Sequence, residues 1–244
     1  LTFWVYLETQ SVFATGMIAG IYLVFTAGFG IWFGSLVDHN SKKRVMLGSS
    51  AVSFVLYAVG FLVLVAAPQG EMQNPASVWL WVLIFIVMLG VIAGNVRSIA
   101  LPTIVTLMIP EDVRDRANGL VGMVTGIGFL TTSMISGFLV AGGGMWLTLI
   151  VALALTAIAF VHLLLVPIDE SKGAPSAMEP SQTAEPKRVD LKGTIAVIAA
   201  VPGLFALIFF ATFNNFLGGV FMALVDAYGF SLVEVLVWGL LRGF

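Results

Sequence analysis

Six long runs of apolar residues limit what this chain can fold into more than any other feature of its sequence. The runs cover residues 12–37, 45–67, 78–108, 119–141, 145–167 and 193–224. Each is longer than the ~20 apolar residues that a helix needs to cross a bilayer. Lipid offers the backbone no hydrogen-bond partners, and the alternating pattern of a barrel strand is missing. The sequence therefore predicts an all-α, polytopic transmembrane helical bundle.

Composition excludes several other classes of protein. Only 10% of the residues are charged and 59% are hydrophobic, whereas a soluble domain carries about a quarter charged residues. The net charge of −2 gives no reason to expect a nucleic-acid partner. Without cysteine there are no disulfides or thiolate metal ligands, and neither a metal-spaced cluster nor a phosphate-binding or nucleophile-elbow motif is present. We expect no enzyme activity, no metal and no cofactor.

The chain divides into three parts, and both of its ends have the character of interrupted helices. Residues 1–7 and 231–244 are apolar but too short to span a bilayer, so we expect a fragment of a longer protein. Residues 168–192 are rich in Pro, Ser, Ala, Glu and Lys, a composition typical of a flexible linker. We therefore expect a transmembrane bundle over 1–167, a linker over 168–192 and the start of a second bundle over 193–244.

Basic residues occur in every second connection between the apolar runs. The basic side chains of these connections are His39, Lys42, Lys43, Arg44, Arg114, Arg116, Lys172, Lys187, Arg188 and Lys192. The alternate connections, 68–77, 142–144 and 226–230, contain no Lys or Arg. By the positive-inside rule, loops 38–44, 109–117 and 168–192 are cytoplasmic. This pattern predicts a multi-pass protein of the plasma or bacterial inner membrane.

The first cytoplasmic loop has a distinctive sequence, from Gly34 to Arg44. Gly30, Gly34 and Asp38 are four residues apart, so they share one helix face. Two glycines at that spacing allow another helix to approach closely. Asp38 and the basic residues after it either control such a contact or only set topology and cap helix ends.

This loop resembles the signature loop of the major facilitator superfamily, which joins the second and third helices. Gly34, Asp38, Lys42 and Lys43 match it. His39 replaces the usual Arg or Lys, and Ser41 the usual Gly. The resemblance implies that the loop, with Arg44, forms a cytoplasmic gate whose charge contacts break and reform during transport.

Three further stretches resemble the drug:proton antiporter branch of that family, particularly its macrolide-efflux-like members. They are residues 97–102, 110–120 and 3–11. The resemblance implies that the complete runs are helices two to six, followed by the central linker, helix seven and the start of helix eight. Gly122, Gly126, Gly128 and Gly137 lie in the implied fifth helix, where they match the antiporter glycines or serve helix packing. Thr132 and Ser133 stand where these antiporters have a Gly-Pro pair.

Arg97 is the one charge deep within an apolar run. An arginine at a helix centre costs about 2.5–3.5 kcal/mol on insertion scales, so it faces a cavity or a partner by default. The alternative is that it snorkels to the cytoplasmic edge. That edge is eleven residues away at Met108, which is about 16 Å, so we favour the cavity. Asn95 lies on another face of the same helix.

Polar residues near other runs complete the set of candidates. Asn214 and Asn215 lie among Phe209, Phe210, Phe213 and Phe216 in the run that the resemblance makes helix seven. There they either face the transport pathway or join helices. Glu8 and Glu234 are candidates for proton coupling, because burial can raise a carboxyl pKa toward neutrality. His162 is interpreted as an interfacial residue near the cytoplasmic end of its helix.

The sequence as a whole favours a secondary-active transporter that exports a small amphiphilic molecule by alternating access and exchanges it for protons. Its partners would be the lipid bilayer, the solute and protons, and we expect a monomer. An importer of the same superfamily is the alternative. A seven-helix receptor or sensor is a third possibility, although no Lys lies deep in the last run as a retinal sensor would need.

Overall fold

The computed structural model describes residues 1–168 and 198–232, and every regular element in these ranges is helical. Four segments are long and apolar enough to cross a membrane, which confirms the predicted all-α membrane fold. The elements are α1 (Thr2–Thr9), α2 (Val12–His39), α3 (Lys42–Ala66), α4 (Val78–Met108), the short 3-10 helix η1 (Glu111–Val113), α5 (Arg114–Leu165) and α7 (Leu204–Leu232).

Polar caps explain where several helices begin and end. The Ser11 hydroxyl accepts a hydrogen bond from the Ala14 amide at 3.1 Å at the start of α2. The Ser77 hydroxyl does the same for the first turn of α4. Such a side chain satisfies a backbone N–H that has no partner within its helix. The predicted spans 12–37, 45–67 and 78–108 therefore agree with α2, α3 and α4 to within three residues.

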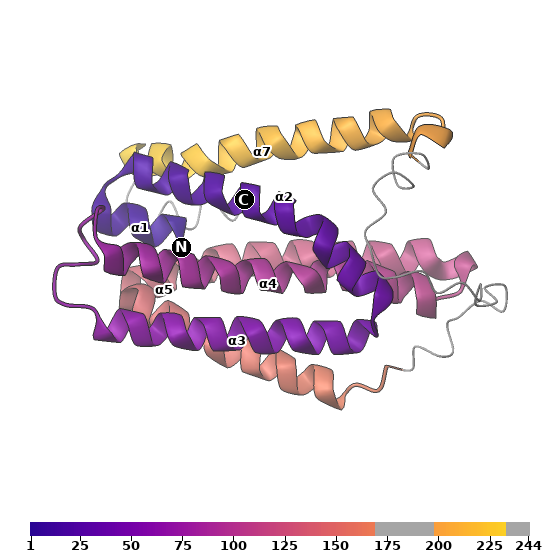
Figure 1. Cartoon of the computed structure of the whole chain (residues 1–244), viewed down its shortest axis with the longest axis horizontal. Coiled ribbons are helices and arrows are strands. Elements are labelled where there is room, and N and C mark those ends of the chain that lie inside the picture. Colours follow the sequence, from indigo (N-terminus) through magenta and orange to yellow (C-terminus); the bar gives the residue numbers. More distant parts are fainter. Residues whose placement is uncertain (169–197, 233–244) are drawn as a thin grey trace.

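The long helix α5 is a hairpin of two spans. Gly144 has φ 59° and ψ −153°, so the chain leaves helical geometry there, and it reverses direction at this point (Figure 1). A Cβ atom at Gly143 would lie 2.5 Å from Leu147 Cβ, too close for any other residue type. The tight turn confirms the break predicted at 142–144 between runs 119–141 and 145–167.

The last run is interrupted, and its predicted end was wrong. Residues 201–203 form a turn, in which the Leu204 amide donates to Val201 O at 3.2 Å and Gly203 has φ 82°. Pro202 lacks the N–H that a continuing helix needs, and the turn separates helical residues 198–200 from α7, which starts at Leu204; the predicted start at 193 lies outside the described residues. Helix α7 continues to Leu232, and 226–230 is therefore helical and not a loop. The predicted linker 168–192 lies, apart from Ile168, outside the described residues, as does Glu234.

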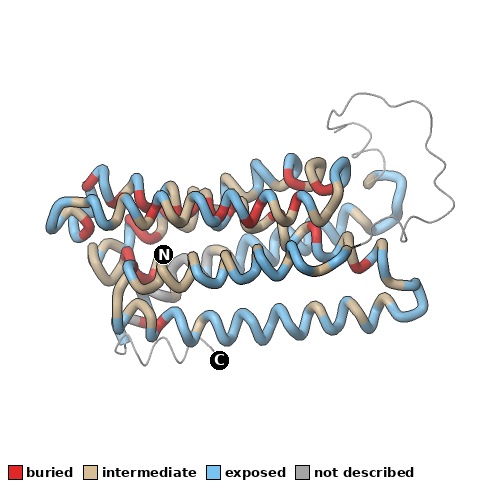
Figure 2. The backbone as a smooth tube through the Cα atoms, turned by 90° about the horizontal axis from the view of Figure 1, so that it is seen from below, coloured by how far each residue is buried: buried red, intermediate tan, exposed pale blue. Residues whose placement is uncertain are grey.

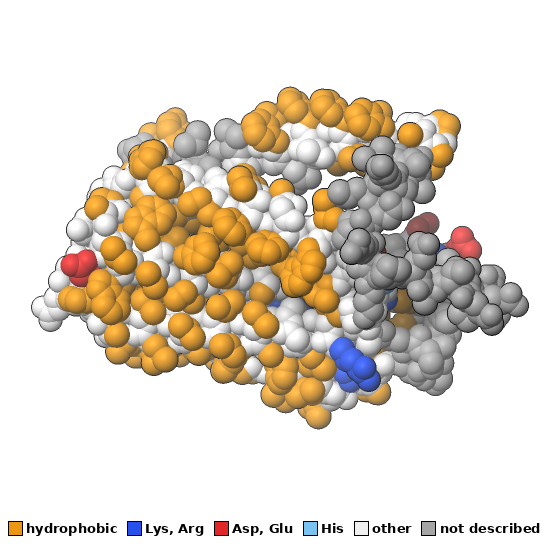
Figure 3. Space-filling view, in the orientation of Figure 1, with side chains coloured by type: hydrophobic (Ala, Val, Ile, Leu, Met, Phe, Trp, Pro, Cys, Tyr) orange, Lys and Arg blue, Asp and Glu red, His pale blue; other side chains and the backbone are white. Residues whose placement is uncertain are grey.

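The elements run antiparallel, with successive connections at opposite ends of the bundle (Figure 1). The α2–α3 and α4–α5 connections lie at one end, where α7 also begins. The α3–α4 connection and the Gly144 turn lie at the other. Apolar side chains cover the middle of the surface and charged ones gather at the ends (Figure 3). This distribution suits a bilayer around the middle, and it places the basic loops 38–44 and 109–117 at one end.

Helix α4 lies at the centre of the described bundle and contacts α2, α3 and α5. Two buried clusters line it. One surrounds Leu80, Leu83 and Ile84 near the non-basic end, and the other surrounds Met88, Ile92 and Val96 toward the basic end. Burial is concentrated in this part of the molecule, whereas other helices are exposed along most of their length (Figure 2).

Candidate functional site

The centre of the candidate site is Arg97, partly buried where α4 packs on α3. Its Nη1 donates a hydrogen bond to the Ser50 hydroxyl at 3.0 Å. Its Nη2 lies 2.9 Å from where a Cβ atom of Gly94 would be, so the absence of a side chain at position 94 makes room for the guanidinium. The head group is thus held between two helices and does not extend along α4 toward Met108.

A stripe of polar residues on α3 faces Arg97 and the backbone of α4. The Ser50 hydroxyl, which accepts from Arg97, donates to Met46 O at 2.8 Å. The fully buried Ser53 hydroxyl donates to Gly90 O at 2.8 Å, which joins α3 to α4. One turn further, the ring of Tyr57 lies against Gly90, where a Cβ atom would be 2.6 Å from Tyr57 Cε1.

The stripe of Ser50, Ser53 and Tyr57 was not predicted from the sequence. The signal was nevertheless present, because spacings of three and four residues place side chains on one helix face. The Tyr57 hydroxyl also lies within electrostatic range of Arg97 and of Tyr22 on α2. Three helices therefore contribute polar groups to one region inside the apolar bundle.

Asn95 extends this region toward α2. Its Nδ2 donates to the Tyr22 hydroxyl at 3.2 Å, while Arg97 faces α3. The two candidates lie on different faces of α4, as the sequence predicted. Hydrogen bonds between membrane helices of this kind contribute about 0.6 kcal/mol on average, so the Asn95–Tyr22 bond holds the site together as well as lining it.

The signature loop lies at the basic end, roughly eight residues along α3 from Ser50. Asp38 is exposed, and its backbone oxygen accepts from Lys42 Nζ at 3.2 Å. Among the residues that the structure describes, no group pairs with the Asp38 carboxylate. His39 is also exposed and contacts Ser35 O through Nδ1 at 2.8 Å. These contacts cap the end of α2, and they leave the gate role of Asp38 a prediction.

Lys43 makes the long-range contact of this loop. Its Nζ donates to Val166 O at 2.6 Å and to Leu164 O at 3.2 Å. A cation at the C-terminal end of a helix interacts favourably with the helix dipole and the free carbonyls. Lys43 therefore ties the start of α3 to the end of α5, a contact that the sequence did not indicate.

The close approach expected at Gly30 and Gly34 is not present. A Cβ atom at either position would meet nothing within 4 Å among the described residues. A small-residue pattern permits close packing but does not by itself supply the partner helix. Among the described helices α2 packs on α4 and α7, and a Cβ atom at Gly219 of α7 would lie 3.1 Å from Leu23 Cδ1.

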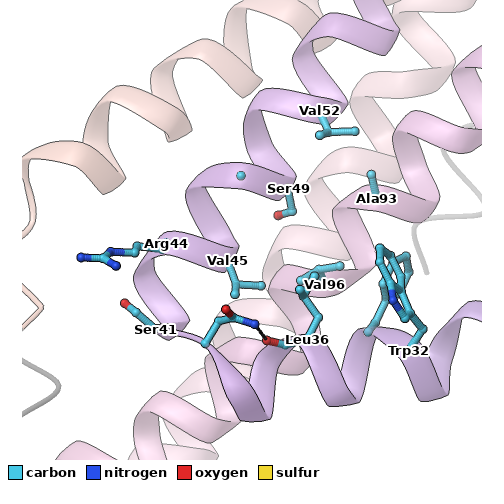
Figure 4. A pocket seen from close by; sticks show the side chains of 12 residues that line it. Trp32, Leu36, Ser41, Arg44, Val45, Ser49, Val52, Ala93 and Val96 are labelled. Carbon is cyan, nitrogen blue, oxygen red and sulfur yellow. Dashed lines mark hydrogen bonds between the residues drawn. The ribbon is translucent and has the colours of Figure 1, made fainter. Parts of the chain in front are cut away.

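A groove of about 420 Å³ opens beside Arg44, between α2, α3 and α4. Figure 4 shows Trp32 from α2 opposite Val52 from α3, with Val96 of α4 between the two helices. Ser49 and Val96 line this groove, and they are the sequence neighbours of Ser50 and Arg97. Arg44 contributes to the rim, and its guanidinium extends away from the groove (Figure 4).

The remaining candidates lie apart from Arg97. Glu8, at the far end of α1, accepts hydrogen bonds from Trp4 Nε1 and Gln73 Nε2, both at 3.1 Å. Asn214 and Asn215 are exposed on α7, and Asn215 Nδ2 donates to Ala211 O at 2.8 Å. His162 is exposed in the last turn of α5. Within the described ranges, no group of His, Cys, Asp and Glu is arranged to hold a metal ion.

Comparison with known proteins identifies one family. The sequence model described as Major Facilitator Superfamily matches residues 2–243. No curated protein and no solved structure matches the chain.

Proposed function

The chain belongs to the major facilitator superfamily. Members of this family transport small solutes across membranes and are not enzymes. On this premise we propose that the protein exports a small amphiphilic molecule by alternating access. In that mechanism two helical bundles move around a binding site near the middle of the bilayer. Residues 1–167 form most of the first bundle, 168–192 connect the two, and 193–244 begin the second.

The observation that carries this proposal is the polar region around Arg97. Arg97 lies about 28 Å from the start of α4 and about 16 Å from its end, at 1.5 Å per residue. This is near the middle of a ~30 Å hydrocarbon core. Polar and charged side chains at such depth mark substrate or ion pathways by default. Arg97 and Asn95, with Tyr22 and Tyr57, form the transport site.

The groove beside Arg44 supplies a route for an amphiphile from the cytoplasmic leaflet. Its walls at Trp32 and Val52 are apolar, and Ser49 and Val96 in its lining are the sequence neighbours of Ser50 and Arg97. An amphiphilic solute can keep its apolar part against these walls while its polar group moves toward Arg97. Asn214 and Asn215 on α7 are further pathway candidates from the second bundle.

Export and proton exchange are supported by the resemblance of residues 97–102 and 110–120 to the drug:proton antiporter branch. Proton exchange requires a group that binds and releases a proton during the cycle, and Glu8 and Glu234 are the candidates. An importer of the same superfamily is the alternative function, and the direction of accumulation separates the two.

Transport in inverted membrane vesicles containing the complete protein tests this function. We expect energised vesicles to accumulate fluorescent amphiphiles and to lose them when a protonophore is added. Arg97→Gln should lower accumulation at least about tenfold, the effect of losing one hydrogen bond to a charged group. Arg116→Gln is the matched control, because it removes the same charge from an exposed position at the basic end.

Each result has a distinct meaning. Accumulation in right-side-out vesicles alone would show import, and accumulation that survives the protonophore would contradict proton coupling. Equal losses in Arg97→Gln and Arg116→Gln would remove Arg97 from the transport site. No movement in either vesicle orientation would contradict a transport function for these solutes.

The gate role of the signature loop has its own test. Asp38→Asn should lower the maximal transport rate several-fold and leave the KM for the solute unchanged, because a gate affects the conformational step and not solute binding. Asp115→Asn is the control, since Asp115 is an exposed acid at the same end of the bundle. A parallel change in KM, or an equal effect of the control, would assign Asp38 to topology alone.

A further inference from the structure

We propose that the transported solute carries an anionic group, a carboxylate or a phosphate ester, and that this group binds to Arg97. The inference rests on the proposed transport function and adds the charge class of the solute.

Arg97 is a positive charge at mid-membrane depth with a neutral partner. Its one hydrogen bond among the described residues is to the Ser50 hydroxyl, and no carboxylate there forms an ion pair with it. A buried charge is normally paired, because an unpaired one carries a large desolvation cost. An anion from outside the protein that binds to the Arg97 guanidinium would offset this desolvation cost.

The acids whose side chains the structure describes lie at the ends of the bundle and not at the level of Arg97. They occupy helix ends or connections, namely Glu8, Asp38, Glu71, Glu111, Asp112 and Asp115. None of these six carboxylates lies at the depth of Arg97.

The groups that surround the guanidinium are suited to an anion. A guanidinium has five N–H donors in a planar fork that matches carboxylate and phosphate oxygens. Only Nη1 is engaged among the described residues. The Tyr57 hydroxyl lies within electrostatic range and makes no hydrogen bond in the described part of the chain. The guanidinium of Arg97 thus offers donors for two oxygens of one anionic group.

A cationic solute would meet the opposite conditions. Like charges repel, and in a site partly shielded from water the repulsion is several times stronger than in solution. Without a carboxylate at this depth, nothing in the described site would offset that repulsion. The chemistry of the site therefore favours an anionic amphiphile over a cationic one.

Three probes of one scaffold test the inference. Dansylglycine carries a carboxylate, its amide is neutral, and dansylethylenediamine is a cation. Binding to the purified complete protein is measured by thermal stabilisation, and transport is measured in inverted vesicles. We expect the carboxylate to bind roughly ten- to a hundredfold more tightly than the amide, the range for hydrogen bonds to a charged group.

Variants of Arg97 and its neighbours connect this preference to the site. Arg97→Gln should abolish the preference for the carboxylate, whereas Arg97→Lys should retain part of it, because the charge remains but the planar fork does not. Gly94→Ala leaves the charge in place and displaces the guanidinium, since the new Cβ would lie 2.9 Å from Nη2. It should weaken binding of the carboxylate more than binding of the amide. Arg116→Gln should leave the preference unchanged.

The outcomes distinguish this inference from the proposed function. Binding of the carboxylate that depends on Arg97, without its accumulation, would support the inference and contradict export. Accumulation of the amide or the cation with an equal or greater affinity would support export and overturn the inference. Stabilisation by none of the three probes would also overturn it. If Arg97→Gln does not elute as a single folded species, Arg97→Lys and Gly94→Ala are used in its place, because both preserve the charge.

Discussion

Helices α4 and α5 have nearly the same hydropathy, yet they have opposite places in the structure. Their most apolar windows have mean hydropathies of 2.3 and 2.5. Nevertheless 39% of that window is buried in α4 and only 6% in the segment that contains α5. The helix that holds Arg97 and Asn95 is thus the buried one, and the more apolar helix is exposed.

This comparison separates two properties that hydropathy does not distinguish. Affinity for the membrane follows from apolar side chains. Burial inside a membrane bundle follows instead from small residues and interhelical hydrogen bonds, because lipid is as apolar as leucine. In α4, Gly90 receives the ring of Tyr57 and accepts from Ser53. In the first span of α5, Gly122 and Gly126 have no atom within 4 Å of a Cβ position.

The strongest test of the comparison exchanges glycine for leucine in each helix. Gly90→Leu should prevent stable folding, because a Cβ alone would lie 2.6 Å from Tyr57 Cε1 and overpacking costs about 1–3 kcal/mol or more. Gly126→Leu should leave stability within about 0.5 kcal/mol of the wild type. The measurement is the monodisperse fraction and Tm of the purified protein in detergent. Similar losses in both variants would show that α5 is also packed.

A second test concerns the turn inside α5. Gly144→Ala should lower stability by about 1–3 kcal/mol, since φ 59° with ψ −153° is close to a region populated almost only by glycine. Gly142→Ala, at a helical position with open space around it, should be neutral or slightly stabilising. The measurement is the Tm of both variants by thermal unfolding in detergent. An unchanged Tm in Gly144→Ala would indicate that the turn can adopt a different geometry.

A third test concerns the long-range hydrogen bonds that join Lys43 to the end of α5. Lys43→Met removes hydrogen bonds to Leu164 O and Val166 O, and we expect a loss of about 1 kcal/mol. Amide exchange in residues 160–166 should accelerate about fivefold. Arg44→Met is the control, because Arg44 is an exposed cation of the same loop that makes no hydrogen bond in the described part of the chain. Equal exchange in the two variants would argue against the anchor.

The smallest expected effect compares hydroxyl groups in the two environments. Ser53→Ala should cost about 0.6 kcal/mol, the average for a hydrogen bond between membrane helices, because Ser53 joins α3 to Gly90 of α4. Thr132→Ala should cost nothing or stabilise, since its hydroxyl bonds within α5 to Gly128 O and such bonds compete with the helix. Denaturation curves that show the reverse order would contradict the assignment of α4 as the packed helix.

The parts of the fold that were predicted correctly depend on local properties. The bounds of α2, α3 and α4 follow from apolar runs and from caps such as Ser11 and Ser77. The turn at Gly144 follows from three successive glycines. The break at 201–203 was missed because the apolar run continues through Pro202 and Gly203, and hydropathy does not register a break made of apolar residues.

The site was predicted only in part for a similar reason. Arg97 and Asn95 are visible as polar residues in an apolar run. Their partners Ser50 and Tyr22 come from other helices, 47 and 73 residues away in sequence. The contact of Lys43 with Val166 spans 123 residues. No local pattern indicates which helices are neighbours.

The sequence by itself determined that this protein spans a membrane and that its connections 38–44 and 109–117 lie at the same end of the bundle. These properties follow from the transfer of apolar and charged groups between water and lipid, which each segment undergoes independently. Only the tertiary structure decided that α4 is central, that Arg97 lies against Ser50 and that Lys43 anchors α5. Inside lipid, helices are selected as neighbours by the fit of small residues and a few polar contacts, and that fit is a property of pairs of surfaces and not of any one segment.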